Sequence, residues 1–236
     1  MPQKIPNRFH RLIARWFADR LGPPTEVQLR AWGEVIAGRH LLVTAPTGSG
    51  KTLAAFLWAI NQLVSGAWPR GETRVLYISP LKALNNDVRK NLLTPLQELA
   101  ACFRVAGAEF PRIGVETRSG DTPGSERQRM LRHPPEILIT TPESLNILLT
   151  SKSGRQILTG ITTVILDEIH AVAGTKRGTH LITAVDRLVP LCGEFQRIAL
   201  SATVRPLETV ADFVGGFIRD GERYRKRKVS IVQADQ

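Results

Sequence analysis

Residues 40–52 read HLLVTAPTGSGKT, and this stretch decides the fold. An apolar run ends in a glycine-bearing loop, and an Ala- and Leu-rich run without Pro or Gly begins at Leu53, so the pattern predicts a strand, a loop and a helix. In such a loop, backbone N–H groups and the helix N-terminus bind phosphate oxygens, a lysine adds charge, and a hydroxyl ligates magnesium. The residues concerned are Thr47, Gly48, Ser49, Gly50, Lys51 and Thr52.

The loop departs from the usual pattern in one place, because Ala45 stands where that pattern begins with glycine. The alternative interpretation is a turn and a helix that bind no phosphate. The apolar run before the loop and the helix-forming run after it favour phosphate binding. A nucleoside triphosphate is therefore the first ligand to expect.

The composition limits the class of protein. The chain has 236 residues, of which 42% are hydrophobic, enough for one substantial core. It contains neither an apolar run of membrane-spanning length nor the apolar core of a secretory signal, so we expect a cytoplasmic protein. Cys102 and Cys192 are far apart, and their spacing indicates neither a zinc site nor a disulfide framework. The formal charge of +11 favours nucleic acid as a partner, although solvated basic faces are also common.

Short apolar runs alternate with helical stretches, which predicts an α/β fold: a mainly parallel sheet with helices on both faces. Polar clusters follow six of the strands, and the carboxyl ends of parallel strands are where such sheets bind ligands. We expect strands over 41–44, 74–78, 113–117, 136–140, 162–166 and 197–200. We expect helices over 5–21, 26–37, 53–60, 82–100 with an interruption near Pro95, 125–132, 143–149 and 179–188.

The sequence suggests three segments: an N-terminal helical segment over 1–38, the α/β domain over 39–218, and a basic C-terminal tail or truncated linker over 219–236. The charge run at 223–228 is compatible with a terminal strand with a solvated face, a basic arm or the start of a linker.

Asp167 and Glu168 follow a buried apolar run. Triphosphate hydrolysis needs magnesium opposite the loop hydroxyl and a group that orients the attacking water. We assign magnesium to Asp167 together with Thr52, and water to Glu168, so that Lys51, Asp167 and Glu168 form the catalytic set. The alternative for an acidic pair after a strand is a helix N-cap, but the phosphate loop favours the catalytic interpretation.

Six motifs together carry a family resemblance: APTGSGKT (45–52), SPLKAL (79–84), SGDT (119–122), TTPES (140–144), DEIH (167–170) and SAT (201–203). In order and spacing they resemble the first RecA-like domain of superfamily 2 helicases. DEIHAVAGTKRG and LSATVRPLE resemble the Lhr (large helicase-related) group of ATP-dependent DNA helicases. The resemblance, from about Phe17 to Gly216, implies a RecA-like P-loop NTPase domain over 39–218, ATP and Mg²⁺ as cofactors, and a link to DNA repair. It implies single-stranded DNA as partner, with RNA or a DNA:RNA hybrid left open.

The resemblance also implies roles by matched position. Gln28 would read the adenine edge, although a glutamine in an amphipathic helix is usually just solvated. Phe17 would stack on adenine or belong to the core. His170, Ser201 and Thr203 would couple the state of the phosphates to the grip on nucleic acid. The residues that would hold the sugar-phosphate backbone are Pro80, Leu81, Lys82, Gly120, Asp121, Thr122, Thr141, Pro142 and Glu143. No aromatic residue occurs among these, so base-stacking platforms should lie elsewhere.

Helicases of this superfamily hold ATP between two RecA-like domains, and the second supplies arginine fingers. The stretch after Thr203 is too short for another such domain. We therefore expect this chain alone to bind ATP and nucleic acid weakly, to hydrolyse ATP slowly or not at all, and to unwind only with a second RecA-like domain, in cis or in trans. The alternatives are a non-motor nucleic-acid-binding module that uses ATP as a structural ligand or signal, and an inactive truncated remnant.

Overall fold

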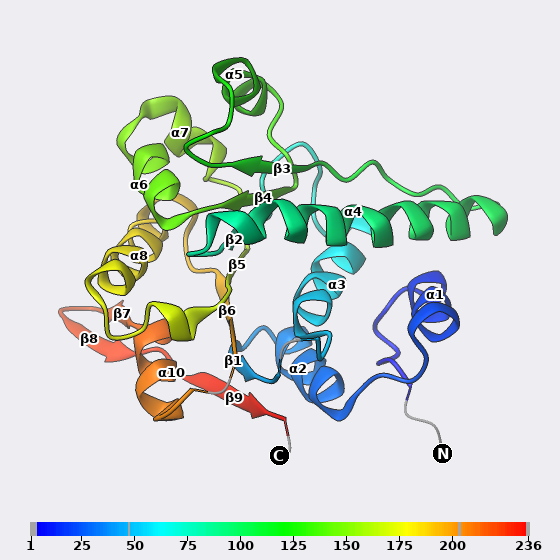
Figure 1. Ribbon diagram of the computed structural model, residues 1–236, viewed down its shortest axis with the longest axis horizontal. Helices are drawn as coiled ribbons and strands as arrows, with labels where there is room; N and C mark the ends of the chain where they lie inside the picture. Colours follow the sequence, from blue (N-terminus) through cyan, green and yellow to red (C-terminus); the bar gives the residue numbers. More distant parts are fainter. Residues whose placement is uncertain (1–3, 47, 203, 235–236) are drawn as a thin grey trace.

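A seven-stranded sheet forms the centre of the computed structural model, which describes residues 4–46, 48–202 and 204–234 (Figure 1). The strand order is β3-β4-β2-β5-β6-β1-β9, and every neighbouring pair is parallel. The carboxyl ends of all these strands therefore lie at one edge. The strands are β1 His40–Thr44, β2 Val75–Ile78, β3 Val115–Arg118, β4 Ile137–Thr140, β5 Thr163–Leu166, β6 Gln196–Ser201 and β9 Val229–Gln233.

The central strands are buried on both faces. Strands β2, β4 and β5 read VLYI, ILIT and TVIL, and all their residues are buried. Continuous apolar runs of this kind are typical of a parallel sheet covered twice. Successive side chains enter different cores, as Leu41 and Val43 pack on one side of the sheet and Leu42 on the other. The mainly parallel sheet predicted from the sequence is confirmed.

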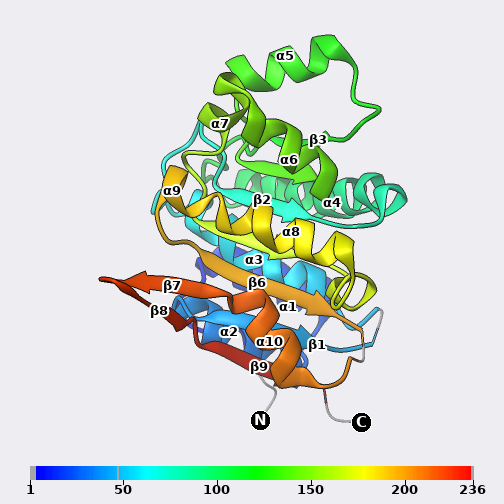
Figure 2. The same ribbon diagram turned by 90° about the vertical axis from the view of Figure 1, so that its left-hand side faces the viewer.

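Helices cover both faces of the sheet (Figure 2). Residues of α1 to α4 belong to the core on one face, and residues of α5 to α10 to the core on the other. Among the helices in the described part of the chain, none is both long and apolar enough to cross a membrane. The helices are α1 Arg11–Leu21, α2 Glu26–Ile36, α3 Lys51–Val64, α4 Lys82–Val105, α5 Gly124–Arg132, α6 Pro142–Thr150, α7 Lys152–Ile157, α8 Lys176–Asp186, α9 Val189–Cys192 and α10 Leu207–Gly215, with a 3₁₀ turn η1 over Ile169–Ala171.

The N-terminal helices share the core of the sheet. Trp32 of α2 is fully buried, and its indole N–H donates to the carbonyl of Ala54 in α3 over 3.0 Å. Trp16 of α1 donates in the same way to Glu98 of α4 over 3.0 Å. The segment predicted over 1–38 thus packs directly onto the α/β body. The helix expected from residue 5 begins only at Arg11.

The predicted interruption at Pro95 is wrong, because α4 runs continuously through this residue. A proline inside a helix removes one backbone hydrogen bond and usually bends or ends the helix. Here Leu92, Leu96 and Leu99 are buried against the sheet on both sides of the proline. The burial of these side chains offsets the lost hydrogen bond and keeps the helix in register.

The expectation of a tail or linker over 219–236 is also wrong for most of its length. Strands β7 Phe217–Asp220 and β8 Arg223–Lys226 form an antiparallel hairpin, and all four residues of β8 are exposed. For 223–226 the interpretation as a solvated strand therefore holds. Strand β9 pairs with β1 along its whole length and is part of the main sheet. The apolar residues Val229, Ile231 and Val232, which follow the charge run, enter the sheet through this pairing.

Arg197 is buried near the start of β6, at the amino edge of the sheet and next to β1. The guanidinium of Arg197 in β6 donates to Asp186 over 2.7 Å and to the carbonyls of Val214 and Gly215 over 3.1 Å. The Nδ1 atom of His40 accepts the backbone N–H of Arg197 over 3.1 Å. Burial, and then the positive charges nearby, lower the pKa of His40 to about 4.

This histidine makes stability depend on pH. Its pKa is lowered by folding, so the unfolded chain binds the proton more tightly, and the stabilisation present above pH 6.5 is lost as the pH falls towards 4. Between pH 7 and pH 5 we expect a loss of about 2 kcal/mol from His40 alone. Urea unfolding at both pH values will measure it, with His40→Asn, which keeps an acceptor but does not titrate, as the matched variant. Equal losses in the two proteins would contradict the assignment.

Candidate functional site

Polar residues meet at the carboxyl edge of the sheet, as predicted from the sequence. Ser79 follows β2, Ser119 follows β3, Thr141 follows β4 and Asp167 follows β5, while Ser201 ends β6. The parallel register puts Thr44 beside Ser201, and Ile78 beside both Leu166 and Thr140. One edge of the molecule thus collects the loops that carry the motifs.

The loop between β1 and α3 turns sharply at its glycines. Gly48 and Gly50 have φ values of 84° and 76°, in the left-handed region that favours glycine. A Cβ on Gly50 would also lie 2.6 Å from the Nε2 atom of Gln28. Lys51 is buried, and its Nζ donates to the carbonyls of Ala45 and Pro46 over 3.1 and 3.4 Å. Thr47 lies outside the described residues.

Two features of this loop suit an anionic ligand. Helix α3 begins with Lys51 and Thr52 and has no side-chain cap, so its first amides keep their capacity to bind an anion. The Oγ atom of Ser49 is buried and has no hydrogen-bond partner among the described residues. Buried polar atoms usually have a partner, and phosphate oxygens are suitable acceptors for this hydroxyl.

Gln28 is buried at the start of α2 rather than solvated. Its Oε1 atom accepts the backbone N–H of Thr25 over 2.9 Å, and its own N–H donates to the Thr25 hydroxyl over 3.3 Å, which makes a capping box. Its Nε2 atom faces Gly50 of the phosphate loop. The helix cap therefore fixes an amide donor beside the loop.

Phe17 is a core residue. It is 2% exposed and packs edge-on against Trp32 with ring centroids 5.4 Å apart. It also borders a hollow of about 420 Å³ at the junction of α1 and α2, beside Pro23 and Pro24. The core role is thus confirmed, and the adenine contact stays a prediction.

The acidic pair is held rigidly after β5. Asp167 is buried; one carboxylate oxygen accepts the hydroxyl of Tyr77, and the other accepts the backbone N–H of Glu168 over 2.8 Å. Glu168 has a φ of 51°, uncommon for a residue other than glycine. The chain turns here into η1 rather than into an N-capped α-helix.

Tyr77 was missed by the sequence analysis. It is fully buried in β2, and its ring stacks on Phe56 of α3 at 5.4 Å, so it joins the acidic pair to the helix that follows the phosphate loop. Burial, and then the charge of Asp167, raise the pKa of Tyr77 far above its ordinary value, which keeps the hydroxyl protonated as a donor. A tyrosine in an otherwise apolar buried strand needs a hydrogen-bond partner, and this signal is visible in the sequence.

His170 joins the acidic pair to the end of β6. Its Nδ1 atom accepts the backbone N–H of Ala202 over 3.3 Å and lies 3.4 Å from the Ser201 hydroxyl. Because an amide can only donate, Nδ1 carries a lone pair, and the ring proton is on Nε2. Nε2 lies 3.3 Å from a carboxylate oxygen of Glu168. Thr203, the third predicted coupling residue, lies outside the described residues.

The predicted nucleic-acid loops contain two kinds of residue. Pro80, Thr122, Thr141 and Pro142 are buried, Leu81, Gly120, Asp121 and Glu143 are exposed, and Lys82 is the first residue of α4. The buried hydroxyls shape the loops, since Thr122 accepts the N–H of Ser119 over 2.9 Å and Thr141 caps α6. Their side chains are thus engaged within the protein, which leaves backbone amides and the exposed residues to meet a ligand.

Two arginines beside these loops, Arg127 and Arg177, are bonded to them. Arg127 of α5 donates to the carbonyls of Gly120 and Thr122 over 2.6 and 2.7 Å, and so fixes that loop. Glu143 accepts from Arg177 over 2.8 Å. Although burial acts to raise the pKa of Glu143, this hydrogen bond and others from Thr141 and the backbone lower it overall. Arg177 thus compensates an acid in a loop that would otherwise repel phosphate.

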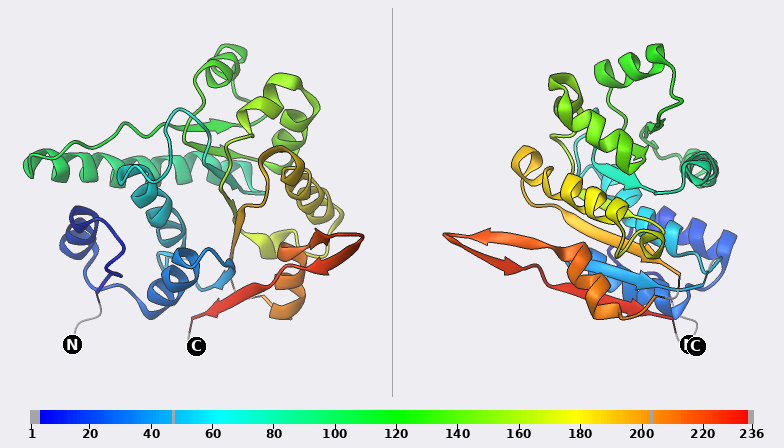
Figure 3. Two further views of the ribbon diagram at one scale, coloured as in Figure 1. Left: turned by 180° about the vertical axis from the view of Figure 1, so that it is seen from behind. Right: turned by 60° about the vertical axis from the view of Figure 1, so that its left-hand side comes forward.

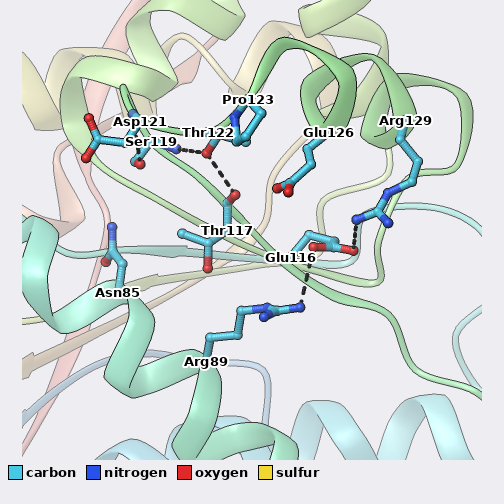
Figure 4. A pocket seen from close by; sticks show the side chains of 10 residues that line it. All are labelled: Asn85, Arg89, Glu116, Thr117, Ser119, Asp121, Thr122, Pro123, Glu126 and Arg129. Atoms are coloured by element: carbon cyan, nitrogen blue, oxygen red, sulfur yellow. Dashed lines mark hydrogen bonds and ion pairs between the residues drawn. The ribbon is translucent and has the colours of Figure 1, made fainter.

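A polar hollow of about 300 Å³ lies between α4 and the loop that follows β3 (Figure 4). On one side Glu116 accepts from Arg129 over 2.8 Å and lies 3.6 Å from Arg89. On the other side Asn85 is 1% exposed, and its carboxamide has no partner in the described part of the chain. An asparagine early in a helix gives no distinctive signal, so Asn85 could not be predicted from the sequence.

Fold and site together define a RecA-like domain of the kind found in helicase motors. The chain belongs to the DEAD/DEAH box helicase family, whose model matches residues 25–213. It is 52% identical over 212 residues to the Lhr helicase/probable uracil glycosylase of Mycolicibacterium smegmatis, and 48% identical over 212 residues to the ATP-dependent helicase Lhr-Core protein 2 of Thermococcus barophilus. The resemblance to the Lhr group seen in the sequence is confirmed.

These relatives are much longer. The matched region covers 89% of this chain in both cases, but only 14% of the first protein and 25% of the second. The solved structure of Mycobacterium smegmatis helicase Lhr bound to ssDNA and AMP-PNP matches with a TM-score of 0.89 and 48% identity, over 97% of this chain and 28% of that one. The predicted RecA-like fold is confirmed by this match.

The contact between Tyr77 and Asp167 can be tested by a double-mutant cycle. Hydrogen bonds to charged groups contribute about 1.5–3 kcal/mol. We expect Tyr77→Phe to lower the free energy of unfolding by that amount in the wild-type background and by much less beside Asp167→Asn, where the acceptor is neutral. Urea denaturation of the four proteins gives the coupling energy. Additive effects would show that the two side chains do not interact.

Proposed function

We propose that this domain is one motor half of an ATP-dependent, Lhr-type DNA helicase, binding Mg²⁺-ATP at the carboxyl edge of its sheet and single-stranded nucleic acid across the neighbouring loops. One observation supports this above all others. The phosphate loop follows β1 and the acidic pair follows β5, and these strands flank β6. Two strand spacings separate the loops by roughly 10 Å, a distance that a magnesium triphosphate can span.

The roles of the nucleotide-binding residues follow from their surroundings. The uncapped start of α3 and the buried Ser49 hydroxyl fit phosphate oxygens, and Lys51 would exchange its loop carbonyls for the terminal phosphates. Gln28 presents its Nε2 amide beside the loop and would donate to the adenine edge. Adenine places its N7 acceptor beside its N6 amino donor, and a carboxamide, which has both a donor nitrogen and an acceptor oxygen, matches that pattern.

Thr52 and Asp167 would hold the magnesium ion. Both carboxylate oxygens of Asp167 already accept a hydrogen bond from the protein. This suits a contact through the water shell that Mg²⁺ tends to retain. When bound, the ion neutralises charge that develops on the transferred phosphoryl group. Glu168 would orient the attacking water and take its proton, with its neighbour His170 fixing the carboxylate.

The nucleic-acid role rests on the loops that begin α4 and α6 and on the loop before α5. Their backbone amides and helix N-termini suit phosphates, which are held without reading the bases. The solved Lhr relative was captured with ssDNA and AMP-PNP together, which supports simultaneous binding of both ligands. Residues 80–82, 120–122 and 141–143 would form this track, and Asn85, whose carboxamide has no partner among the described residues, would add a contact beside it. Because such contacts rarely inspect the 2′-hydroxyl, this track would accept the backbones of DNA and RNA alike.

Hydrolysis and unwinding would need a second RecA-like domain, from the same or a separate polypeptide, because the arginine fingers of this superfamily come from the second domain. His170, bonded to Ala202 and close to Ser201, would relay the state of the phosphates at Glu168 to the strand end at β6. We also propose that the protein is cytoplasmic and takes part in DNA repair. The name of the Mycolicibacterium smegmatis relative, which includes a probable uracil glycosylase, supports the link to repair.

Lys51→Ala tests the nucleotide site. Removal of the only lysine in the loop should weaken binding of Mg²⁺-AMP-PNP about 10- to 100-fold, the equivalent of one charge-assisted hydrogen bond. Isothermal titration calorimetry measures this, with the exposed Lys152→Ala as the matched control. Wild-type affinity in Lys51→Ala, or no uptake by the unmodified chain even after fusion to a second RecA-like domain, would refute the site.

Glu168→Gln tests the motor. We expect the isolated chain to hydrolyse ATP about 10³- to 10⁵-fold more slowly than the same chain fused to the second RecA-like domain of an Lhr helicase, since arginine fingers contribute that factor. In the fusion, Glu168→Gln should bind nucleotide normally but lose turnover stimulated by single-stranded DNA. A steady-state ATPase assay decides. If single-stranded DNA does not change the ATP turnover of the fusion, and nucleotide does not change its affinity for DNA, a non-motor module becomes the better interpretation.

A further inference from the structure

The hairpin of β7 and β8 projects from the amino edge of the sheet, away from the site described above (Figures 2 and 3). It leads directly into β9, whose first residue, Val229, pairs with His40, the first residue of β1. The phosphate loop follows the other end of β1. The hairpin therefore presents a surface that the proposed nucleotide and nucleic-acid sites do not use.

One face of the hairpin combines aromatic and basic side chains. Across the two strands Phe217 pairs with Lys226, and Arg219 pairs with Tyr224. Directly paired residues of antiparallel strands share a face, as do alternate residues of one strand. These four side chains therefore form the hairpin face. Its rings are unusually accessible, because Phe217 is 55% exposed and Tyr224 is 71% exposed.

The hairpin face borders an open hollow of about 850 Å³ against the end of α8 and α9. Phe217, Arg219 and Tyr224 line it from the hairpin. Two acids also line it, but each is already compensated, since Asp186 accepts from Arg197 and Glu194 from Arg227, both over 2.7 Å. The acids therefore do not cancel the charge of the hairpin face.

The base of the hairpin is firmly attached. The guanidinium of Arg227 is 4% exposed and donates to the carbonyls of Gly215 and Phe217 over 3.0 and 2.5 Å, in addition to its pair with Glu194. A surface that is fixed before binding loses less conformational entropy when it binds. The contacts of Arg227 therefore fix the base of the hairpin and, with it, the positions of the Phe217 and Tyr224 rings.

We propose that the hairpin face binds a segment of single-stranded nucleic acid, with bases stacked on Phe217 and Tyr224 and a phosphate at Arg219. Residues 217–228 contain six Lys and Arg against two Asp and Glu, which favours a polyanion. Aromatic rings set among cations are the usual means of holding single strands without sequence preference. Lys226 pairs with Asp212 over 2.5 Å, whereas Arg219 uses its Nε on the carbonyl of Gly221 over 2.9 Å and keeps its terminal amino groups for the main phosphate contact.

This surface supplies what the carboxyl-edge loops lack. Those loops contain no aromatic residue, so their backbone contacts alone provide no stacking platform. An acidic peptide would satisfy the cations but would leave two exposed rings without a matched partner. A strand of bases and phosphates satisfies both features together, which is why we choose it over a protein partner.

The test is the affinity of the full 236-residue chain for labelled single-stranded oligothymidylate by fluorescence anisotropy. The double variant Phe217→Ala/Tyr224→Ala should bind at least tenfold more weakly, because each stacking platform contributes about 1–3 kcal/mol. Tyr224→Phe, which keeps the ring, and Val105→Ala, which removes an exposed apolar group elsewhere, should bind like the wild type. Unchanged affinity in the double variant would overturn the proposal.

Photocrosslinking gives a second readout that does not depend on the stability of a variant. An oligonucleotide with 5-iododeoxyuridine should crosslink to Phe217 or Tyr224 in the wild-type chain, as mapped by mass spectrometry. Crosslinks confined to 79–82, 119–122 and 141–144 would overturn the proposal. Loss of AMP-PNP binding in Lys51→Ala with hairpin crosslinks retained would separate the two sites, so failure of one proposal can be told apart from failure of the other.

Discussion

Parallel hydrogen bonding between every neighbouring pair of strands in the main sheet is the constraint on which the rest of the structure depends. Each strand must be entered from the same edge, so each loop that carries a motif is delivered to the opposite edge. Segments as far apart in sequence as Thr44 and Ser201 become neighbours through this pairing alone. The sheet thereby brings the loops of the site together, and side-chain contacts then fix their details.

Within that edge, the buried carboxylate of Asp167 imposes a second requirement. A charged group out of water must be hydrogen-bonded, or its burial destabilises the fold. Tyr77 and the backbone of Glu168 meet the requirement from two directions. The same contacts also hold the carboxylate still. Tyr77 also packs on Phe56 and so joins the acidic pair to helix α3. The contacts of Tyr77 therefore both stabilise the fold and fix the geometry of the site.

Much of this could be predicted from local sequence. The glycine loop before α3, the acidic pair after β5 and the six strands along the chain carry strong patterns, because glycine turns and continuous apolar runs are compatible with few local structures. Features decided by tertiary packing could not be predicted in this way. Buried leucines on both sides of Pro95 keep α4 continuous, and pairing with β1 makes a strand of residues 229–233. The hydroxyl of Tyr77 in an apolar strand signals the need for a partner, but only the fold shows that the partner is Asp167, and Asn85 gives no signal in the sequence.

His170 links the end of β6 to the acidic pair, so a movement of one affects the other. Its imidazole accepts from a backbone amide on one side and donates towards a carboxylate on the other. Such a ring is polarised by both partners at once. If the Ala202 amide withdraws, the ring loses the hydrogen bond that fixes its orientation, and the contact of Nε2 with Glu168 loses its support. The placement of the Glu168 carboxylate therefore depends partly on the position of a peptide group at the end of a different strand.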